Sequence, residues 1–199
     1  MTIHMLDQSL AHQMQDADAD GKVDALFAYI EKNGGTNYDD QVTQLEHALQ
    51  TAALAKSAGG THAQVTSALL HDLGHLLVSE HNTENDFLEE DLEHEVVGAK
   101  YLEPFFPQEV TVPIGLHVPS KRYLCTVDVG YYDGLSASSK HSFEVQGGKM
   151  SDAERTEFEK TSHLEFAVQL RRWDDGGKVG GCEVPGLKAY RDDVLACLI

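Results

Sequence analysis

The segment that most constrains this chain is His71-Asp72-Leu73-Gly74-His75, which follows an apolar helical run over residues 65–70. Imidazole and carboxylate groups are both good metal ligands, and here they are adjacent in the chain. Neighbouring side chains on a helix diverge by about 100°, so only a bridging ion or a pair of ions would use both. A His-Asp dipeptide alone is common. In this context it predicts that Asp72 bridges two metal ions.

Further candidate ligands lie on both sides of this segment, on separate predicted helices. Helix packing can bring such side chains together in the core of a bundle. Nitrogen and oxygen ligands suit iron, manganese or zinc, and the lack of cysteine ligands disfavours a structural zinc site. Three ligands per ion would leave positions open for substrate and for water or dioxygen. The predicted ligands are His47, His71, Asp72, His94, His117 and Asp174.

The remaining sequence reads as one helix after another and predicts an all-α fold. Apolar residues recur at helical spacing, and no segment alternates with period two for long enough to demand a sheet. Capping boxes are expected at Thr61, Ser151 and Ser162. Gly74 is expected to break the helix that precedes it. The expected helices are 23–33, about 40–58, 61–73, 94–103, 108–116 with a kink or late start at Pro113, 135–144, 162–175 and 187–198.

Length and composition predict a soluble, cytoplasmic, single domain. The 199 residues suit one domain over residues 1–199, with an N-terminal extension and first helix over 1–36. A formal charge of -18 argues against nucleic acid, and no apolar run suits a membrane span or a secretory signal. The three cysteines are odd in number and widely spaced, which predicts no disulfide framework. Residues 79–93 are acidic and are expected to form a lid or a solvated face.

Five short motifs in order resemble the HD-domain superfamily. Within it they are similar to the mixed-valent diiron oxygenases, which include myo-inositol oxygenase and the dioxygenases that cleave 1-hydroxy-2-aminoethylphosphonates. The resemblance covers residues 37–192 and implies an HD-domain helical bundle with a dinuclear metal site in its core. The motifs are Gln44-Leu45-Glu46-His47, Leu70-His71-Asp72-Leu73-Gly74-His75, Glu93-His94-Glu95, His117-Val118-Pro119-Ser120-Lys121 and Arg171-Arg172-Trp173-Asp174.

The resemblance also implies the cofactor and the role of each ligand. Two iron ions, one Fe(II) and one Fe(III), would act with dioxygen as co-substrate. Asp72 would bridge the two ions. One iron would be held by His47, His71 and Asp174, and the other by His94 and His117.

A small organophosphonate is the substrate that the resemblance implies. Lys121 and Arg171 lie four residues after and three before proposed ligands, where a cation would neutralise an anion bound to iron. Without the motif, a surface charge would be the favoured interpretation of either cation, and a helix cap that of Ser139. The residues implied to bind the phosphonate are His75, Lys121, Ser139 and Arg171.

The amine-recognition segment departs from the glycine-forming relatives, in which a Tyr and then a Glu three residues later precede the Gln-Leu-Glu-His motif. Here Asp40 stands at the Glu position and Tyr38 is shifted by one. The shorter carboxylate would leave room for a bulkier cation, and the Tyr38 ring could bind a quaternary ammonium by cation–π contact. Alternatively, Tyr38 is an ordinary loop aromatic and Asp40 caps a helix.

We therefore expect oxygen-dependent cleavage of the C–P bond of 1-hydroxy-2-(trimethylammonio)ethylphosphonate, which gives glycine betaine and phosphate. The same reaction on 2-amino-1-hydroxyethylphosphonate, which gives glycine, is an alternative. A rival from another reaction class is a metal-dependent HD-domain phosphohydrolase, which uses the same ligands to activate water. A myo-inositol oxygenase and a metal-stabilised binding module are further alternatives; an uncharged polyol would not require Lys121 and Arg171.

Overall fold

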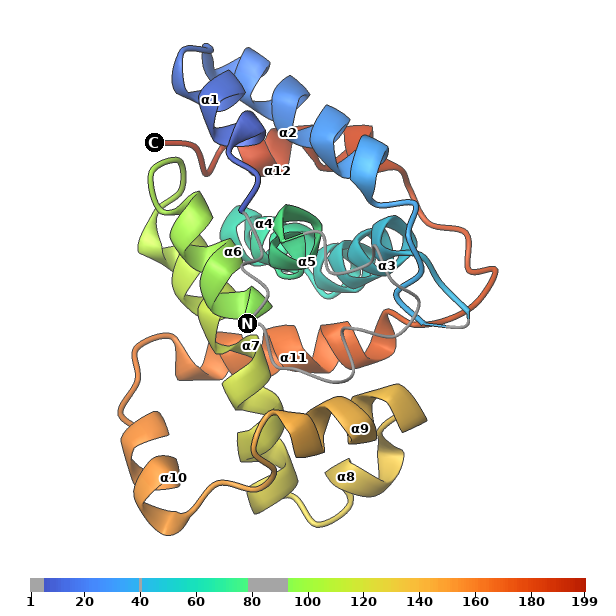
Figure 1. The fold of residues 1–199 in the computed structure, drawn as a ribbon, viewed down its shortest axis with the longest axis vertical. Coiled ribbons are helices and arrows are strands. Elements are labelled where there is room, and N and C mark those ends of the chain that lie inside the picture. The colour runs from blue at the N-terminus through green and yellow to red at the C-terminus, as the bar shows by residue number, and fades with distance from the viewer. Residues whose placement is uncertain (1–5, 40, 79–92) are drawn as a thin grey trace.

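The computed structural model describes residues 6–39, 41–78 and 93–199, and these fold as a bundle of helices (Figure 1). This confirms the predicted all-α fold; within the described ranges, the β-type pairing is one isolated bridge between Asn37 and Thr43. The elements are α1 (Ser9–Gln15), α2 (Ala19–Asn33), α3 (Gln44–Ser57), α4 (His62–Leu70), α5 (Leu73–Leu77), α6 (His94–Leu102), α7 (Gln108–Val127), α8 (Tyr131–Gly134), α9 (Ala137–Val145), α10 (Asp152–Phe158), α11 (Leu164–Gly176), η3 (Leu187–Tyr190) and α12 (Arg191–Leu195).

The helices are arranged around a central group formed by α3, α4 and α5, with α6 packed beside α7 at its edge (Figure 1). Helices α1, α2 and α12 lie on one side of this group. Helices α7 and α11 cross on the other side of this group, and α8 to α10 extend beyond them around the far end of α7. The main core is built from α1 to α7, α11 and the C-terminal helices, and a second small core contains Cys125, Leu135 and Phe143. Among the described residues, none of the helices combines the length and the apolar character that crossing a bilayer requires.

Side-chain caps determine where several helices begin. The Thr61 and Ser151 capping boxes form as predicted. A further capping box at Thr43 starts α3 at Gln44, four residues later than expected. The expected box at Ser162 is wrong, because α11 starts after His163, which has a left-handed backbone (φ 63°) and makes no side-chain cap hydrogen bond. This backbone conformation redirects the chain between Ser162 and the first turn of the helix.

The helix break in the central motif lies at His71 and Asp72 rather than at Gly74, so that expectation was wrong. Helix α4 ends at Leu70, and Asp72 (φ -102°, ψ 12°) precedes α5. Gly74 lies inside α5. This position requires glycine, because a Cβ there would lie 2.0 Å from the His94 carbonyl oxygen. The glycine therefore lets α5 touch α6, and the break before it turns His71 and Asp72 into the core.

Helix α7 runs through both Pro113 and Pro119. The late start considered for this helix is therefore not observed. Its continuity keeps His117 and Lys121 on one face, because they are four residues apart. The acidic segment 79–93, expected to form a lid or a solvated face, lies outside the described residues except for Glu93, and so does Asp40.

Candidate metal centre

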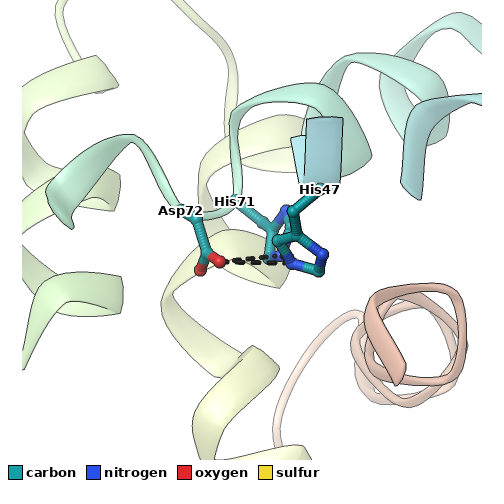
Figure 2. Close-up of side chains that lie close together, drawn as sticks. All are labelled: His47, His71 and Asp72. Carbon is teal, nitrogen blue, oxygen red and sulfur yellow. Dashed lines mark hydrogen bonds and ion pairs between the residues drawn. The ribbon is translucent and has the colours of Figure 1, made fainter. Parts of the chain in front are cut away.

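The six predicted ligands meet in the middle of the bundle, and all are buried. They come from different elements: α3, the α4–α5 junction, the start of α6, α7 and α11. Figure 2 shows three of them, with the His47 and His71 rings both facing the Asp72 carboxylate. Ligand atoms lie within 4.8 Å of one another in three overlapping groups: His47, His71 and Asp72; His71, His117 and Asp174; and Asp72, His94 and His117.

Asp72 lies at the centre of this cluster. Its Oδ2 is 3.3 Å from Nε2 of both His47 and His71. Its Oδ1 is 3.3 Å from Nε2 of His117 and 3.4 Å from Nε2 of His94. Each carboxylate oxygen therefore faces its own pair of imidazoles. A carboxylate that bridges two cations needs this arrangement.

The outer nitrogens of three rings fix the orientation of their inner nitrogens. Nδ1 of His47 donates to the Gly177 carbonyl (2.8 Å), and Nδ1 of His71 donates to the Ala68 carbonyl (2.9 Å). His117 Nδ1 likewise donates to a main-chain carbonyl at 2.8 Å. A carbonyl only accepts, so Nδ1 carries the proton and Nε2 of a neutral ring carries a lone pair. This hydrogen bond is typical of metal-binding histidines.

The tautomers have a direct consequence for His47 and His71. Their Nε2 atoms are 3.1 Å apart, so two lone pairs would face each other if both rings were neutral and nothing lay between them. Either a proton on one ring or a metal cation must resolve this contact. The protein's donor set therefore fits a metal ion at this point.

Ionisation of the cluster also suits a metal. Burial lowers the pKa of His71 to about 4, and burial together with nearby His75 lowers that of His94 to about 3. Although His47 is buried, its hydrogen bonds to Asp174 and Asp72 raise its pKa, which lets a proton take the cation's place. The pKa of Asp72 stays well below its usual value despite burial, because His71 and the other rings surround it. Neutral imidazole and ionised carboxylate are the forms that bind metals.

Asp174 adds a second carboxylate beside His47 and His71, the two imidazoles that face Asp72 Oδ2. Its Oδ1 is 3.3 Å from His47 Nε2, and its Oδ2 is 4.0 Å from His71 Nε2. Arg171, one turn away on the same helix, contacts Oδ2 at 2.7 Å, and Lys178 contacts Oδ1 at 3.1 Å. These cations keep the pKa of Asp174 well below its usual value although the group is buried.

Three of the predicted substrate-binding residues are buried beside this end of the cluster: Lys121, Ser139 and Arg171. Lys121 Nζ donates to Ser142 Oγ at 2.8 Å, and Arg171 Nε donates to Tyr131 Oη at 3.2 Å. Burial, reinforced by Arg171 and Lys178, lowers the pKa of Lys121 to about 7. The fold therefore gathers positive charge in a buried cluster beside Asp174, although the overall charge of the chain is strongly negative.

The other predicted substrate residues lie against the histidine rings. His75 stacks on His94 with ring centroids 3.7 Å apart. Tyr38 is partly buried and stacks on His47 with centroids 4.0 Å apart. Burial, together with Asp174 and the other carboxylates, raises the pKa of Tyr38 well above its usual value. The sixth predicted residue, Asp40, is outside the described part of the chain.

Sequence reasoning missed four polar residues of this buried cluster: Tyr131, Ser142, Asp175 and Lys178. Asp175 contacts both Arg171 and the Tyr131 hydroxyl. Lys178 contacts Asp174 and donates to Ser139 Oγ at 3.2 Å. The spacing of Asp174 and Lys178 at i and i+4 could have indicated their pairing. Tyr131 and Ser142 carry no such signal, because their partners are 21 to 44 residues distant in the chain.

Comparison with known proteins agrees with this geometry. A family model described as "HD domain" matches residues 45–118, which include all the predicted ligands except Asp174. The chain is 54% identical over 177 residues to a hydroxymethylphosphonate dioxygenase of Gimesia maris, covering 89% of this chain and 88% of the relative. It is 38% identical over 164 residues to a [1-hydroxy-2-(trimethylamino)ethyl]phosphonate dioxygenase (glycine-betaine-forming) of Leisingera caerulea, covering 82% of this chain and 83% of the relative.

Proposed function

We propose, starting from the fact that this chain belongs to the HD-domain phosphonate dioxygenases, that it uses dioxygen to cleave the C–P bond of a short 1-hydroxyalkylphosphonate. The observation that carries the proposal is the Asp72 carboxylate, whose two oxygens each face a pair of buried imidazoles. A buried cluster of cationic side chains beside these ligands suits a phosphonate anion. A phosphohydrolase would use similar ligands, but the relatives are oxygenases.

The metal assignment is part of this proposal. Two iron ions in the Fe(II)/Fe(III) state, when bound, would supply the redox chemistry that activates dioxygen. Asp72 would bridge them. One iron would be held by His47, His71 and Asp174, and the other by His94 and His117.

The chain's own residues would bind and orient the substrate. Lys121 and Arg171 would neutralise the phosphonate, and their burial strengthens this attraction because little water screens it. Ser139 and His75 would add hydrogen bonds to the phosphonate oxygens. Arg171 also contacts Asp174, so the charge that binds substrate and the carboxylate that binds metal are held as one unit.

Hydroxymethylphosphonate is the first candidate substrate, because the relative with that named activity is the more similar of the two. One hydroxymethylphosphonate dianion and one dioxygen would give formate, hydrogen phosphate and a proton; the C–P bond breaks and both oxygen atoms enter the products. The second candidate is the trimethylammonio substrate expected from the sequence, with glycine betaine as product. The aromatic ring that could receive its ammonium group is Tyr38, which lies beside His47.

Oxygen uptake and phosphate release by anaerobically iron-loaded protein test the proposal. Hydroxymethylphosphonate, 2-amino-1-hydroxyethylphosphonate and the trimethylammonio compound are supplied separately, with equimolar oxygen uptake and phosphate release expected for the true substrate. His94→Ala serves as the inactive control. Phosphate release from phosphate esters without oxygen uptake would instead identify a phosphohydrolase.

A further inference from the structure

We infer that Lys178 is a specificity-determining residue: it holds the protein's own ammonium group against the Tyr38 ring, and so excludes substrates that carry a cationic head group. The inference rests on the proposed function and deepens it. It assigns the enzyme to 1-hydroxyphosphonates whose carbon substituent is uncharged, the simplest being hydroxymethylphosphonate.

Lys178 is fixed by three partners at once. Its Nζ lies 5.1 Å from the centroid of the Tyr38 ring, within the range of a cation–π contact. The same atom is 3.1 Å from Asp174 Oδ1 and 3.2 Å from Ser139 Oγ. The Lys178 side chain is only 8% exposed. Its ammonium is therefore a built part of the buried cluster of cations rather than a mobile surface charge.

Tyr38 is the aromatic residue next to the metal ligands on which recognition of a quaternary ammonium would depend. Its ring stacks on His47 with centroids 4.0 Å apart and an interplanar angle of 23°. Lys178 supplies a cation to the same ring. A substrate ammonium would have to approach this ring next to a buried like charge, which repels it strongly where little water screens the charges.

The charges around Lys178 also disfavour a substrate with a cationic head group. Lys121 and Arg171 are buried nearby, and together with Lys178 they face the two carboxylates Asp174 and Asp175. Both carboxylates are already engaged by Arg171, and Asp174 also by Lys178. A phosphonate dianion is attracted by this excess of cationic side chains over carboxylates. A second positive group on the substrate would find Asp174 and Asp175, the carboxylates described beside these cations, already engaged.

The competing explanation is that Lys178 only supports Asp174. Removal of the lysine would then weaken the metal site and reduce turnover of every substrate by the same factor. Selection by charge predicts instead that the ratio between a cationic and a neutral substrate changes. The measurement therefore compares two compounds of nearly the same shape.

The test uses iron-loaded protein with 1-hydroxy-2-(trimethylammonio)ethylphosphonate and its uncharged isostere 1-hydroxy-3,3-dimethylbutylphosphonate. Wild type is expected to have the higher kcat/KM with the isostere. Lys178→Met should raise the cationic-to-neutral ratio about tenfold, and Lys178→Arg should retain the wild-type ratio. Lys140→Met is the matched control, because Lys140 makes a similar contact with Tyr132 (5.4 Å) away from the metal ligands, and its ratio should not change.

Calorimetric binding of the same two compounds under nitrogen provides a readout that needs no turnover. If no phosphonate supports oxygen uptake, the proposed reaction is wrong, yet the ratio of Kd values still tests Lys178. Lys178→Gln keeps a group able to bond to Ser139 and replaces the Met variant if that variant fails to fold. A wild-type preference for the cationic compound, or an unchanged ratio in the charge-removing variant, overturns the inference.

Discussion

The two halves of the ligand cluster are built differently around the shared Asp72. The half with His47 and His71 has both outer ring nitrogens hydrogen-bonded to main-chain carbonyls, and it has a second carboxylate in Asp174. The half with His94 and His117 has two imidazoles and, among the described residues, shares its nearby carboxylates with the other half: Asp72 groups with His94 and His117, and Asp174 groups with His117 and His71. His94 Nδ1 faces Glu95 Oε2 at 3.7 Å rather than a carbonyl.

This difference indicates that the two metal positions have different roles. A metal held by three protein ligands and the bridge is retained firmly, whereas one held by two and the bridge keeps more positions for substrate or dioxygen. Arg171 and Lys178 further secure Asp174 on the first half. We therefore expect the His94–His117 half to lose its metal first and to bind the substrate. The following variants can break or sharpen this comparison.

Asp72→Ala should have the largest effect, because it removes the ligand that both halves share. We expect both metals to be lost and turnover to fall on the order of a thousandfold or more, since several kcal/mol of metal-dependent stabilisation disappears. Metal content per chain and oxygen uptake measure the result. Asp128→Ala, a half-exposed carboxylate outside the cluster, is the control. An Asp72→Ala protein that kept two metals would contradict the bridging assignment.

His94→Ala and His47→Ala separate the two halves. Without His94, its half keeps only His117 and the bridge, so we expect about one metal per chain and at least a hundredfold loss of turnover. Without His47, its half keeps His71, Asp174 and the bridge, so more metal should remain. Dialysis against increasing chelator, followed by metal analysis, measures the difference. Equal metal loss in both variants would show that the halves are equivalent.

The six candidate ligands could be proposed from the sequence because each lies in a short local motif, on a helix or, for His71 and Asp72, at the junction between α4 and α5. Gln44-Leu45-Glu46-His47 and the His71-Asp72 pair are local patterns, and the structure brings their imidazoles within 3.1 Å of each other. The break between α4 and α5 could not be located in the same way. Gly74 is needed for a contact with His94, twenty residues away, and a break signal in the sequence does not reveal it.

The buried cluster of cations could be expected only in part from the sequence, because several of its members meet through contacts between distant segments. Lys121 and Arg171 lie within the motifs, whereas the polar network around them joins distant segments. Tyr131 and Ser142 reach Arg171 and Lys121 only after α8 and α9 have folded back against α7. Lys178 follows the glycine pair that ends α11, where its side chain could have pointed to solvent. Tertiary packing decided its position.

Two glycine substitutions should have intermediate effects, one on each half. A Cβ on Gly177 would lie 2.4 Å from Thr51 Oγ1 and 3.3 Å from His47 Nδ1. A Cβ on Gly74 would meet the His94 carbonyl oxygen at 2.0 Å. We expect Gly177→Ala and Gly74→Ala each to weaken metal binding by about 10- to 100-fold, each on its own half. Metal titration measures this, with Gly35→Ala, which has open space around it, as the unchanged control.

A smaller effect should appear as pH dependence, because the pKa values of the two cations expected to bind the phosphonate, Lys121 and Arg171, are shifted in opposite directions. Burial lowers the pKa of Lys121, one turn after His117, to about 7, whereas Asp174 and Asp175 raise the pKa of Arg171 despite its burial. The folded chain therefore releases the Lys121 proton at a pH where the unfolded chain still holds it. The contribution of this group to stability rises from about pH 7 to about pH 10.

Phosphonate binding should follow the opposite trend, because the anion prefers the charged lysine. We expect the affinity ratio of wild type to Lys121→Met to fall several-fold as pH rises from about 6 to about 8.5. The ratio of wild type to Arg171→Met should stay constant over this range, because the guanidinium remains charged. The ionisation of the phosphonate itself cancels in both ratios. A flat Lys121 ratio would mean that this lysine is fully charged in the folded protein and that Lys121 and Arg171 present equivalent cations to the substrate.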